Sequence, residues 1–408
     1  MPVNLSPPKK SDLLAIDGVR LGVACAGIKK ADHPDLVLIE LDHNTVTSAV
    51  YTQNAFCAAP VIVAKQHQID AKPQYLLINS GNANAGTGDV GLEATQACCE
   101  AIAEIANVHS NTVLPFSTGV IGEPLPVAKI QQALPTAYNR LSTDNWFDAA
   151  HAIMTTDTVA KAVSKQLEIN GVTITVTGMA KGSGMIRPDM ATMLAYIATD
   201  ATVEQAVLDK MLTQAVAQSF NRITVDGDTS TNDACLLMAT GNAANPMITE
   251  FESDEAQTLY RVIAAITQQL AHAIIRDGEG ATKFVAIHVK QGQDEAECRH
   301  VAYTIAHSPL VKTALFASDP NWGRILAAVG RTGIDNFELS KVAIYLDDIC
   351  IVVSGQPAES YTEEKGQQVM NKEDINITVE LGRGQAEETV WTCDFSYDYV
   401  KINAEYRT

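Results

Sequence analysis

The stretch from residue 177 to residue 200 places the strongest constraint on how this chain can fold. It contains a glycine pair and a proline, and then an apolar, partly β-branched run from Met193 to Thr199. Gly182 and Gly184 allow backbone conformations that other residues avoid, while Pro188 fixes one torsion angle and biases the residue before it toward an extended form. The pattern predicts a tight turn that leads into a strand.

A hydroxyl side chain stands where this turn meets the strand, at the Ala191–Thr192 step. The nearest carbonyl is that of Ala191, in the peptide bond of Thr192 itself. Attack on it gives an ester by an N-to-O acyl shift, and hydrolysis leaves Thr192 as a new N-terminus. Such a residue carries a hydroxyl nucleophile and an amine base with a pKa of about 7.7–8.0. The alternative is that Thr192 only begins a buried strand, and position alone does not decide between them.

Composition indicates a globular protein of ordinary type. Hydrophobic residues make up 46% and charged residues 19% of the 408 residues, which suffices for two or more domains. The net charge of −19 argues against nucleic-acid and anionic-membrane partners. No stretch approaches the ~18 apolar residues of a membrane span, and residues 1–12 lack the apolar centre of a signal peptide. Because the cysteines form no C-x-x-C pair, we expect reduced thiols and a cytoplasmic location.

The first part of the chain predicts several short strands followed by helices. We expect strands at 35–41, 45–52, 58–64, 75–79 and 112–116, and helices at 92–106 and 145–153. The loop at 79–88 is either a ligand loop or a rigid connection that caps the next helix. After the strand at 112–116, Thr118 and Gly119 can aim a hydroxyl and a backbone N–H at one point, as an oxyanion hole requires. The S-T-G sequence alone is a weak signal, because most copies are turns.

Two further segments carry several polar side chains. In M-T-T-D-T at 154–158, Thr155 and Thr156 can bind a ligand, but the pattern favours local caps, with Asp157 capping the segment that follows. A helix expected at 203–219 leads to the acidic loop 220–233. Its spacing does not match a Ca²⁺ loop, which needs a glycine at position six and a late glutamate. We therefore rank metal binding below a structural or active-site loop.

The last part of the chain predicts a second, smaller domain. A helix with apolar residues at three- and four-residue steps covers 254–276 and stops just before Glu279, which lies between two glycines. We expect Glu279 to be an exposed, positionable carboxylate, with a solvated loop acid as the alternative. The polar segment 291–297 marks a domain boundary. Beyond it we expect an α+β unit with a tail tied down by the preceding strand, made of a helix at 296–316 and strands at 342–346, 349–353, 375–381 and 389–395.

Motifs spread over nearly the whole chain form one combination. They are A-G-I-K at 26–29, N-S-G-N-A-N-A at 79–85, S-T-G-V-I-G at 117–122, M-T-T-D-T at 154–158, K-G-S-G-M-I-R-P-D-M-A-T-M-L at 181–194, R-D-G-E-G-A-T-K at 276–283, D-P-N-W-G-R-I at 319–325 and I-N-A-E-Y-R-T at 402–408. In this combination the chain resembles the ornithine acetyltransferases, the glutamate N-acetyltransferases of the arginine pathway. It departs from the family pattern at Gly86, where a cysteine is expected. Arg187 and Asp189 replace a smaller residue and an asparagine, close enough to the scissile bond to alter the rate of self-cleavage.

The resemblance implies a mixed α/β (α+β) fold. This is the αββα-type sandwich of the aminopeptidase/ornithine acetyltransferase superfamily, with a smaller C-terminal α+β domain at about 290–400. It also implies self-cleavage between Ala191 and Thr192, which divides the chain into residues 1–191 and residues 192–408, the second with 408 − 191 = 217 residues.

The resemblance also implies a role for each site residue. Thr192 is the nucleophile, and Thr118 and Gly119 form the oxyanion hole. The substrate contacts are Thr155, Lys181, Thr192, Glu279, Asn403 and Thr408. A lysine cation and hydroxyls suit an α-carboxylate, and a glutamate suits the amine of ornithine.

The implied reaction is ping-pong transfer of acetyl from N2-acetyl-L-ornithine to L-glutamate through the threonine. No cofactor or metal is expected, and use of acetyl-CoA as a second donor stays open. The family suggests a heterotetramer of two alpha and two beta chains.

Three alternatives use the same residues differently. An N-terminal-nucleophile aminopeptidase or amidase of the same fold would pass the acyl group to water. A Mg²⁺-dependent phosphoryl transferase would use the acidic loop and K-G-S-G, but G-x-x-x-x-G-K-[ST] is absent. A non-catalytic binding protein would show neither cleavage nor turnover.

Overall fold

The computed structural model describes residues 2–187 and 193–405 and divides into two compact units. The large unit comprises Ser6–Asn221 and Asp228–Ile274. The small unit comprises Met1–Leu5, Arg222–Gly227 and Ile275–Thr408. The smaller domain predicted at about 290–400 lies inside the small unit, which begins earlier in the chain.

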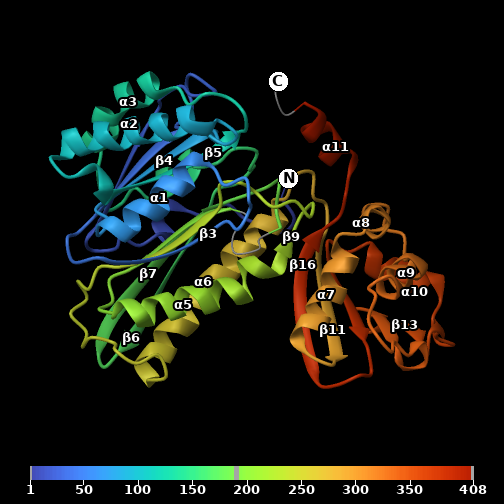
Figure 1. The fold of residues 1–408 in the computed structure, drawn as a ribbon. Helices are drawn as coiled ribbons and strands as arrows, with labels where there is room; N and C mark the ends of the chain where they lie inside the picture. Colours follow the sequence, from blue (N-terminus) through green and yellow to red (C-terminus); the bar gives the residue numbers. More distant parts are fainter. Residues whose placement is uncertain (1, 188–192, 406–408) are drawn as a thin grey trace. The chain divides into compact units, whose positions relative to one another are not determined.

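Two β-sheets form the centre of the large unit (Figure 1). The first sheet has the order β1 (Val19–Ala24), β2 (Leu36–Leu41), β4 (Tyr75–Asn82) and β5 (Val113–Val120). The second has the order β3 (Val46–Tyr51), β10 (Ala234–Ala239), β8 (Leu194–Thr199), β7 (Val172–Lys181) and β6 (Lys161–Ile169). The pairs β4–β5 and β8–β10 are parallel, whereas the other neighbours are antiparallel. Parallel neighbours begin and end at the same edge, so the residues that follow β4 and β5 emerge together.

The inner faces of these two sheets pack directly on each other. Leu21, Ile78 and Phe116 from the first sheet share one buried cluster with Met179 and Tyr196 from the second. The rings of Phe116 and Tyr196 meet edge to face with centroids 5.5 Å apart, an arrangement that aromatic pairs prefer. Alternate apolar side chains of both sheets therefore form the core of a sandwich.

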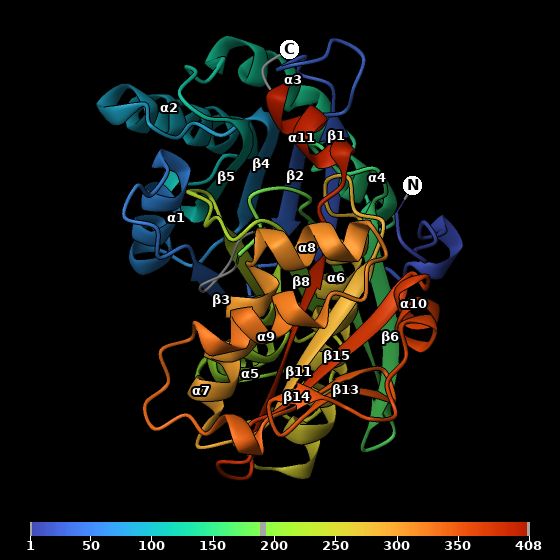
Figure 2. The ribbon, with the colours of Figure 1, turned by 90° about the vertical axis from the view of Figure 1, so that its right-hand side faces the viewer.

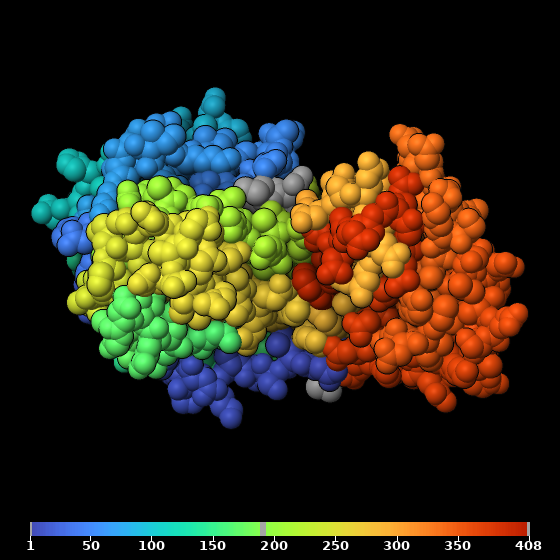
Figure 3. Space-filling model, turned by 90° about the horizontal axis from the view of Figure 1, so that it is seen from below, coloured from blue at the N-terminus to red at the C-terminus, as the bar shows by residue number. Residues whose placement is uncertain are grey.

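Helices cover both outer faces of this sandwich. The helices of the large unit are α1 (Ala59–Asp70), α2 (Gly88–Ala106), α3 (Val127–Asn139), α4 (Trp146–Ala152), α5 (Gln205–Gln218) and α6 (Asp254–Arg276), of which α4 instead adds side chains to the cluster between the sheets. On the first sheet, Ile102 of α2 and Leu134 of α3 share a cluster with Leu36 and Leu77. On the second sheet, a Cβ atom added to Gly178 would contact the side chains of two α6 residues, so α6 packs against this sheet. In Figure 3, the yellow-green and yellow surface belongs to the segments that contain α5 and α6. The αββα-type sandwich is thus confirmed.

A single seven-stranded sheet forms the small unit. Its order is β14 (Gln356–Pro357), β13 (Ile349–Val353), β12 (Ala343–Leu346), β15 (Asp374–Glu380), β11 (Phe284–Gly292), β16 (Ala386–Cys393) and β9 (Ile223–Thr224). Its helices are α7 (Glu295–Ala306), α8 (Pro309–Phe316), α9 (Trp322–Gly330), α10 (Glu363–Met370) and α11 (Tyr397–Ala404). Apolar side chains of α7, α8, α9 and α10 share one buried cluster with the sheet, so this unit has its own core. Figure 2 shows the ribbon of these helices and strands.

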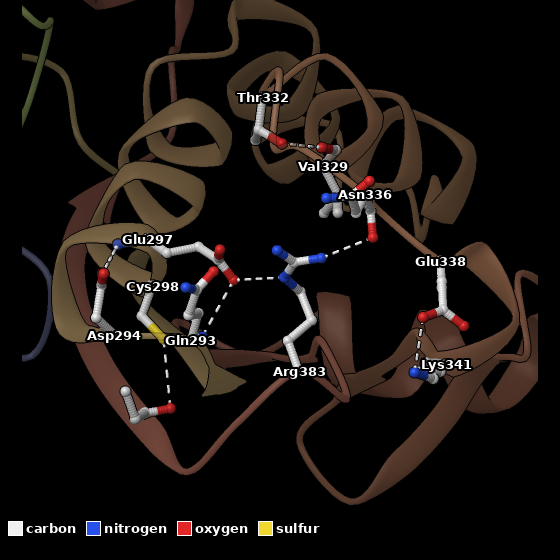
Figure 4. Close-up of polar contacts among 11 residues, drawn as sticks. Gln293, Asp294, Glu297, Cys298, Val329, Thr332, Asn336, Glu338, Lys341 and Arg383 are labelled. Carbon is white, nitrogen blue, oxygen red and sulfur yellow. Dashed lines mark hydrogen bonds and ion pairs between the residues drawn. The ribbon is translucent and has the colours of Figure 1, made fainter.

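A polar clamp joins two loops of the small unit (Figure 4). Arg383, in the turn between β15 and β16, donates through Nε to Glu297 Oε1 at 2.9 Å and through Nη1 to the carbonyl of Asn336 at 2.8 Å. The same Glu297 oxygen accepts from the backbone N–H of Gln293 at 3.2 Å, while its own N–H is capped by Asp294 Oδ1 at 2.8 Å. The side chains of Arg383 and Glu297 are 14% and 11% exposed, so the pair lies near the surface.

Several predicted elements need correction. The segment 58–64 is not a strand but the start of α1, because Pro60 fits the first turn of a helix, where no N–H partner is needed. The helix predicted at 296–316 is two helices, since Ser308 caps α8 and Pro309 begins it. The strand predicted at 112–116 continues through Val120.

Some elements lack a clear local pattern. The predictions omitted β1, β6, β7, β9, β10, β14, α3, α9 and α10. The tail, expected only to be tied down, forms the helix α11. No helix within residues 2–187 and 193–405 is long and apolar enough to cross a membrane.

Candidate active site

The parallel ends of β4 and β5 bring Thr118 and Gly119 to one edge of the first sheet. Thr118 pairs with Ser80 and Gly119 with Gly81 in the register of the two strands. Gly119 has a φ of +137°, and a Cβ on it would lie 2.3 Å from the carbonyl carbon of Gly81 and 2.5 Å from the nitrogen of Asn82. Only glycine fits this approach, because any side chain would push the two strands apart.

Lys181 ends β7 and points its ammonium group at Thr118. The Nζ of Lys181 donates to Thr118 Oγ1 at 3.2 Å, and each of the two residues is 8% exposed. A hydroxyl that accepts from a lysine retains its own hydrogen as a donor. The contact therefore orients Thr118 as a hydrogen-bond donor with a cation behind it, which is the arrangement that stabilises a developing oxyanion.

A buried carboxylate ties Lys181 to the loop that carries Thr155. Asp157 Oδ1 accepts from Lys161 Nζ at 2.6 Å and from the backbone N–H of Gly182 at 2.8 Å. Its Oδ2 accepts from the backbone N–H of Thr155 at 3.1 Å. Asp157 was expected to cap the segment that follows, but that segment is strand β6, and the carboxylate instead joins residues distant in sequence.

Asp157 is ionised in spite of its burial. Burial alone would raise the pKa of its carboxyl, but the charges of Lys161 and Lys181 lower it, as do hydrogen bonds from Lys161 and Gly182. The net effect holds the pKa of Asp157 well below its usual range. A fixed negative charge thus lies behind the lysine that contacts Thr118.

Asn232 connects the two sheets at the same edge. Its Nδ2 donates to the carbonyl of Ala83, just after β4, at 2.6 Å, and to the carbonyl of Ser117 in β5 at 2.9 Å. The acidic loop 220–233, ranked above as a structural or active-site loop, therefore supports the Thr118 strand. Among the described residues no group of three or more His, Cys, Asp or Glu side chains could hold a metal ion.

The residues of the predicted cleavage point, Ala191 and Thr192, lie outside the described residues. Strand β8 begins two residues after Thr192, and its first residue, Leu194, pairs with Lys181 on one side and with Ala234 on the other. The chain that follows the predicted nucleophile thus starts beside the lysine of the site. Of the departures from the family pattern, Gly86 has a φ of +68°, which glycine adopts without strain, and Asp189 lies outside the described residues.

The small unit holds two other predicted substrate residues, and they contact each other. The Nδ2 of Asn403 in α11 donates to Glu279 Oε2 at 2.8 Å. Glu279 is 5% exposed, so the expectation of an exposed carboxylate was wrong. Gly280 has a φ of +68°, and a Cβ on it would lie 2.4 Å from the nitrogen of Tyr399, so α11 packs closely on this loop. Thr408 lies outside the described residues.

Further contacts hold the loop of Glu279 in place. The buried carboxylate of Asp394 accepts from the backbone N–H and hydroxyl of Thr282 at 2.7 and 2.6 Å and from the N–H of Lys283 at 2.8 Å. Ser396 Oγ, which also caps α11, donates to the carbonyl of Gly280 at 2.6 Å. Glu279 is therefore fixed by its loop rather than free to adopt many positions.

The structure groups the predicted residues into two sets. Thr118, Thr155 and Lys181 belong to the large unit and are linked directly or through Asp157. Glu279 and Asn403 belong to the small unit. Sequence reasoning did not identify the connecting roles of Asp157 and Asn232, because each depends on partners far away in the chain. The signal available was only that both lie in polar segments, Asp157 in M-T-T-D-T at 154–158 and Asn232 in the acidic loop 220–233.

The fold and the site together indicate an α/β enzyme with two sheets, in which a lysine donates a hydrogen bond to a hydroxyl near the end of a strand. The ArgJ family model matches residues 20–408, and the chain belongs to that family. The arginine biosynthesis bifunctional protein ArgJ of Pseudomonas syringae pv. tomato is 54% identical over 393 residues, which cover 96% of this chain and 97% of that protein. The protein of the same name from Pseudomonas fluorescens is 53% identical over the full length of both chains.

Two solved structures are also similar to this chain. The arginine biosynthesis bifunctional protein ArgJ of Bacillus halodurans is 37% identical with a TM-score of 0.48, over 50% of this chain and 95% of that chain. The ornithine acetyltransferase of Mycobacterium tuberculosis, solved as a complex with ornithine, is 32% identical with a TM-score of 0.40, over 46% of this chain and 99% of that chain.

Proposed function

We propose that this chain transfers acetyl from N2-acetyl-L-ornithine to L-glutamate, giving L-ornithine and N-acetyl-L-glutamate, through an N-terminal threonine that it exposes itself. Membership of the ArgJ family makes the chain an acyltransferase of arginine biosynthesis. The observation that carries the proposal is the contact of Lys181 Nζ with Thr118 Oγ1 beside Gly119. It supplies oriented donors for an acyl-transfer intermediate.

The first step is cleavage of the chain. The hydroxyl of Thr192 attacks the carbonyl of Ala191, and hydrolysis of the ester gives chains of residues 1–191 and 192–408. The new amine of Thr192 then acts as the base. It takes the hydroxyl proton while the oxygen attacks the acetyl carbonyl of N2-acetylornithine.

The oxyanion that forms accepts hydrogen bonds from the hydroxyl of Thr118 and the backbone N–H of Gly119. When the intermediate collapses, the bond between the acetyl carbon and the ornithine nitrogen breaks, and the ammonium of Thr192 returns the proton to that nitrogen. The amine of glutamate then attacks the acetyl-threonine ester and regenerates the enzyme.

Both substrates share an α-amino acid core, so one set of contacts serves both in turn. Lys181 and Thr155 suit the α-carboxylate, and Glu279 suits the side-chain amine of ornithine. Asn403 already donates to Glu279 and holds one of its oxygens in place. Thr192 and Thr408 complete the proposed contacts.

The remaining elements of the proposal concern donors and assembly. Acetyl-CoA is a plausible second acetyl donor, and the relatives' designation as bifunctional supports this. No other cofactor is required by the chemistry above. We further propose a cytoplasmic heterotetramer of two alpha and two beta chains.

The test is intact mass together with transfer activity. Freshly purified protein should give two chains, the second beginning at Thr192, and should form N-acetylglutamate from N2-acetylornithine and glutamate. The variant Thr192→Ala should remain one inactive chain, whereas Thr192→Ser, which keeps a hydroxyl, should still be cut. An uncut but active Thr192→Ala protein would overturn the mechanism. Release of acetate without glutamate would instead indicate the aminopeptidase or amidase alternative.

A further inference from the structure

Lys312 is a buried lysine of the small unit that the reaction described above does not use. It lies in α8 and is 1% exposed. Its Nζ donates to Thr392 Oγ1 at 2.9 Å and to the carbonyl of Cys393, and it lies 4.5 Å from the centroid of the Phe395 ring. Lysine is almost never fully buried unless its charge is satisfied, so this side chain needs an explanation.

The position of Lys312 is unfavourable for a charge. Burial lowers the pKa of its ammonium, whereas Cys393, Asp394 and Asp226 raise it. An apolar side chain of similar length would fill the same space without the cost of removing a charge from water. The ammonium therefore serves a purpose other than filling the core of the small unit.

The end of β16 accepts both hydrogen bonds of the ammonium, and the residues there also hold the loop of Glu279. The carboxylate of Asp394 accepts from the N–H and the hydroxyl of Thr282 at 2.7 and 2.6 Å. A Cβ atom added to Gly278 would lie 3.3 Å from Cys393 Sγ. The loop thus contacts the end of β16 on both sides of Glu279.

The same lysine also supports α11, the helix that carries Asn403. The backbone N–H of Phe395 donates to the carbonyl of Lys312 at 3.2 Å. The ring of Phe395 stacks on that of Tyr399 in α11, with centroids 4.4 Å apart. Asn403 lies one helical turn further on and donates to Glu279 at 2.8 Å. Both proposed substrate contacts described in the small unit are therefore linked to one ammonium.

We infer that Lys312 is a positioning residue whose buried ammonium holds Glu279 and Asn403 in the arrangement that binds the side-chain amine of ornithine. The inference rests on the proposed function, because it takes Glu279 as the partner of that amine. Glutamate ends in a carboxylate, which gains no attraction from another carboxylate. Lys312 therefore sets the affinity for the acetyl donor and has little influence on glutamate as the acceptor.

The variant Lys312→Met tests this role, because methionine keeps an unbranched side chain without the ammonium. In a ping-pong reaction, kcat/KM for each substrate depends only on its own half-reaction. The value for N2-acetylornithine should fall about 10-fold, roughly the effect of one lost hydrogen bond, while the value for glutamate stays within about 2-fold of the parent. Calorimetry should show that binding of ornithine is also weakened about 10-fold.

A general loss of stability in the small unit would give a different pattern. Partial unfolding lowers the concentration of active enzyme and reduces kcat/KM for both substrates by the same factor. Arg383→Ala is the control, because it removes hydrogen bonds to Glu297 and Asn336 that bind neither proposed substrate contact. This variant should keep the parent's ratio of the two kcat/KM values.

Thr392→Val is a second, milder variant. It removes one acceptor of the ammonium and keeps the shape of a side chain that is fully buried. The value of kcat/KM for N2-acetylornithine should fall about 2- to 5-fold, and the value for glutamate should be unchanged. If Lys312→Met does not fold, this variant decides: a fall for the donor alone supports the inference, and parent-like values for both substrates overturn it.

The outcomes separate this inference from the proposed function. Equal losses for both substrates in Lys312→Met, or parent-like values for both, would overturn the inference and leave the proposed function intact. A parent protein that transfers no acetyl from N2-acetylornithine to glutamate would reject the proposed function. The calorimetric comparison would still test Lys312 in that case, because equal affinity for ornithine in the parent and in Lys312→Met would overturn the inference.

Discussion

Each unit contains a cluster of charged side chains, and the two clusters are built differently. In the large unit, the side chains of Asp157 and Lys161 are both 0% exposed. In the small unit, Arg383 and Glu297 are 14% and 11% exposed. Asp157 of the buried pair accepts from the backbone N–H groups of Thr155 and of Gly182, the residue after Lys181, which contacts Thr118. The outer pair joins the turn between β15 and β16 to the first turn of α7, and neither segment carries a proposed catalytic group.

The difference shows what a buried charge is used for in this fold. Moving an ion pair out of water costs more free energy than the attraction between the two charges recovers, unless further hydrogen bonds satisfy both partners. Asp157 has such bonds, and the residues that donate them are the ones whose positions the chemistry needs. Arg383 retains contact with solvent, so its cluster is expected to matter for stability alone.

The largest effect is expected from Asp157→Asn. It leaves Lys161 buried without its counter-charge, which should destabilise the large unit by about 3–5 kcal/mol. Urea unfolding measures this difference. The double variant Asp157→Asn/Lys161→Met should recover much of the loss, because it no longer buries an unpaired charge. A double variant that is less stable than the single one would show that the pair acts in another way.

Thr118→Ala should lower turnover by about 10²- to 10³-fold, because it removes one donor to the oxyanion. Weak activity should remain through Gly119. The matched variant Thr118→Ser keeps the hydroxyl and should retain most of the activity. Steady-state kinetics of the cleaved proteins, with thermal unfolding as a control for folding, make the comparison. Unchanged turnover in Thr118→Ala would remove this residue from the mechanism.

The pH dependence of stability should distinguish Asp157 from surface acids. Its pKa is depressed in the folded protein, so its contribution is fully present above the unfolded-state pKa of about 3.9 and is lost as the pH falls through the folded value. Urea unfolding from pH 6 downward should therefore show the parent and Asp157→Asn converging in stability only below about pH 4. A stability difference that shrinks at higher pH would contradict the depressed pKa.

The smallest effects are expected in the small unit. Arg383→Ala removes hydrogen bonds to Glu297 and Asn336 and should lower the free energy of unfolding by about 1–2 kcal/mol without altering turnover. Lys341→Ala is its control, because Lys341 and Glu338 form an ion pair whose side chains are 49% and 58% exposed. That variant should change stability by less than about 1 kcal/mol. Loss of turnover in Arg383→Ala would contradict the expectation that the cluster in the small unit affects stability alone.

Much of the fold could be predicted from local patterns. The helix predicted at 254–276 coincides with α6, and the strand predicted at 349–353 coincides with β13. The segment at 58–64 failed because an apolar β-branched run is ambiguous, and its packing decides for a helix. There, Ala58 and Val61 are buried with Ala83 and Ala85, and His67 Nδ1 contacts the carbonyl of Val113 at 2.8 Å.

The periodic elements, the adjacent Thr118 and Gly119, and the family could all be predicted, since they depend on neighbouring residues or on motifs taken in order along the chain. The burial of Glu279 and the links from Asp157 to Thr155 and Gly182 became visible only in the folded chain. These contacts join residues that lie far apart along the chain. Asn403 is 124 residues from Glu279, and no local pattern can state whether a polar side chain will find a partner that far away before the chain has folded.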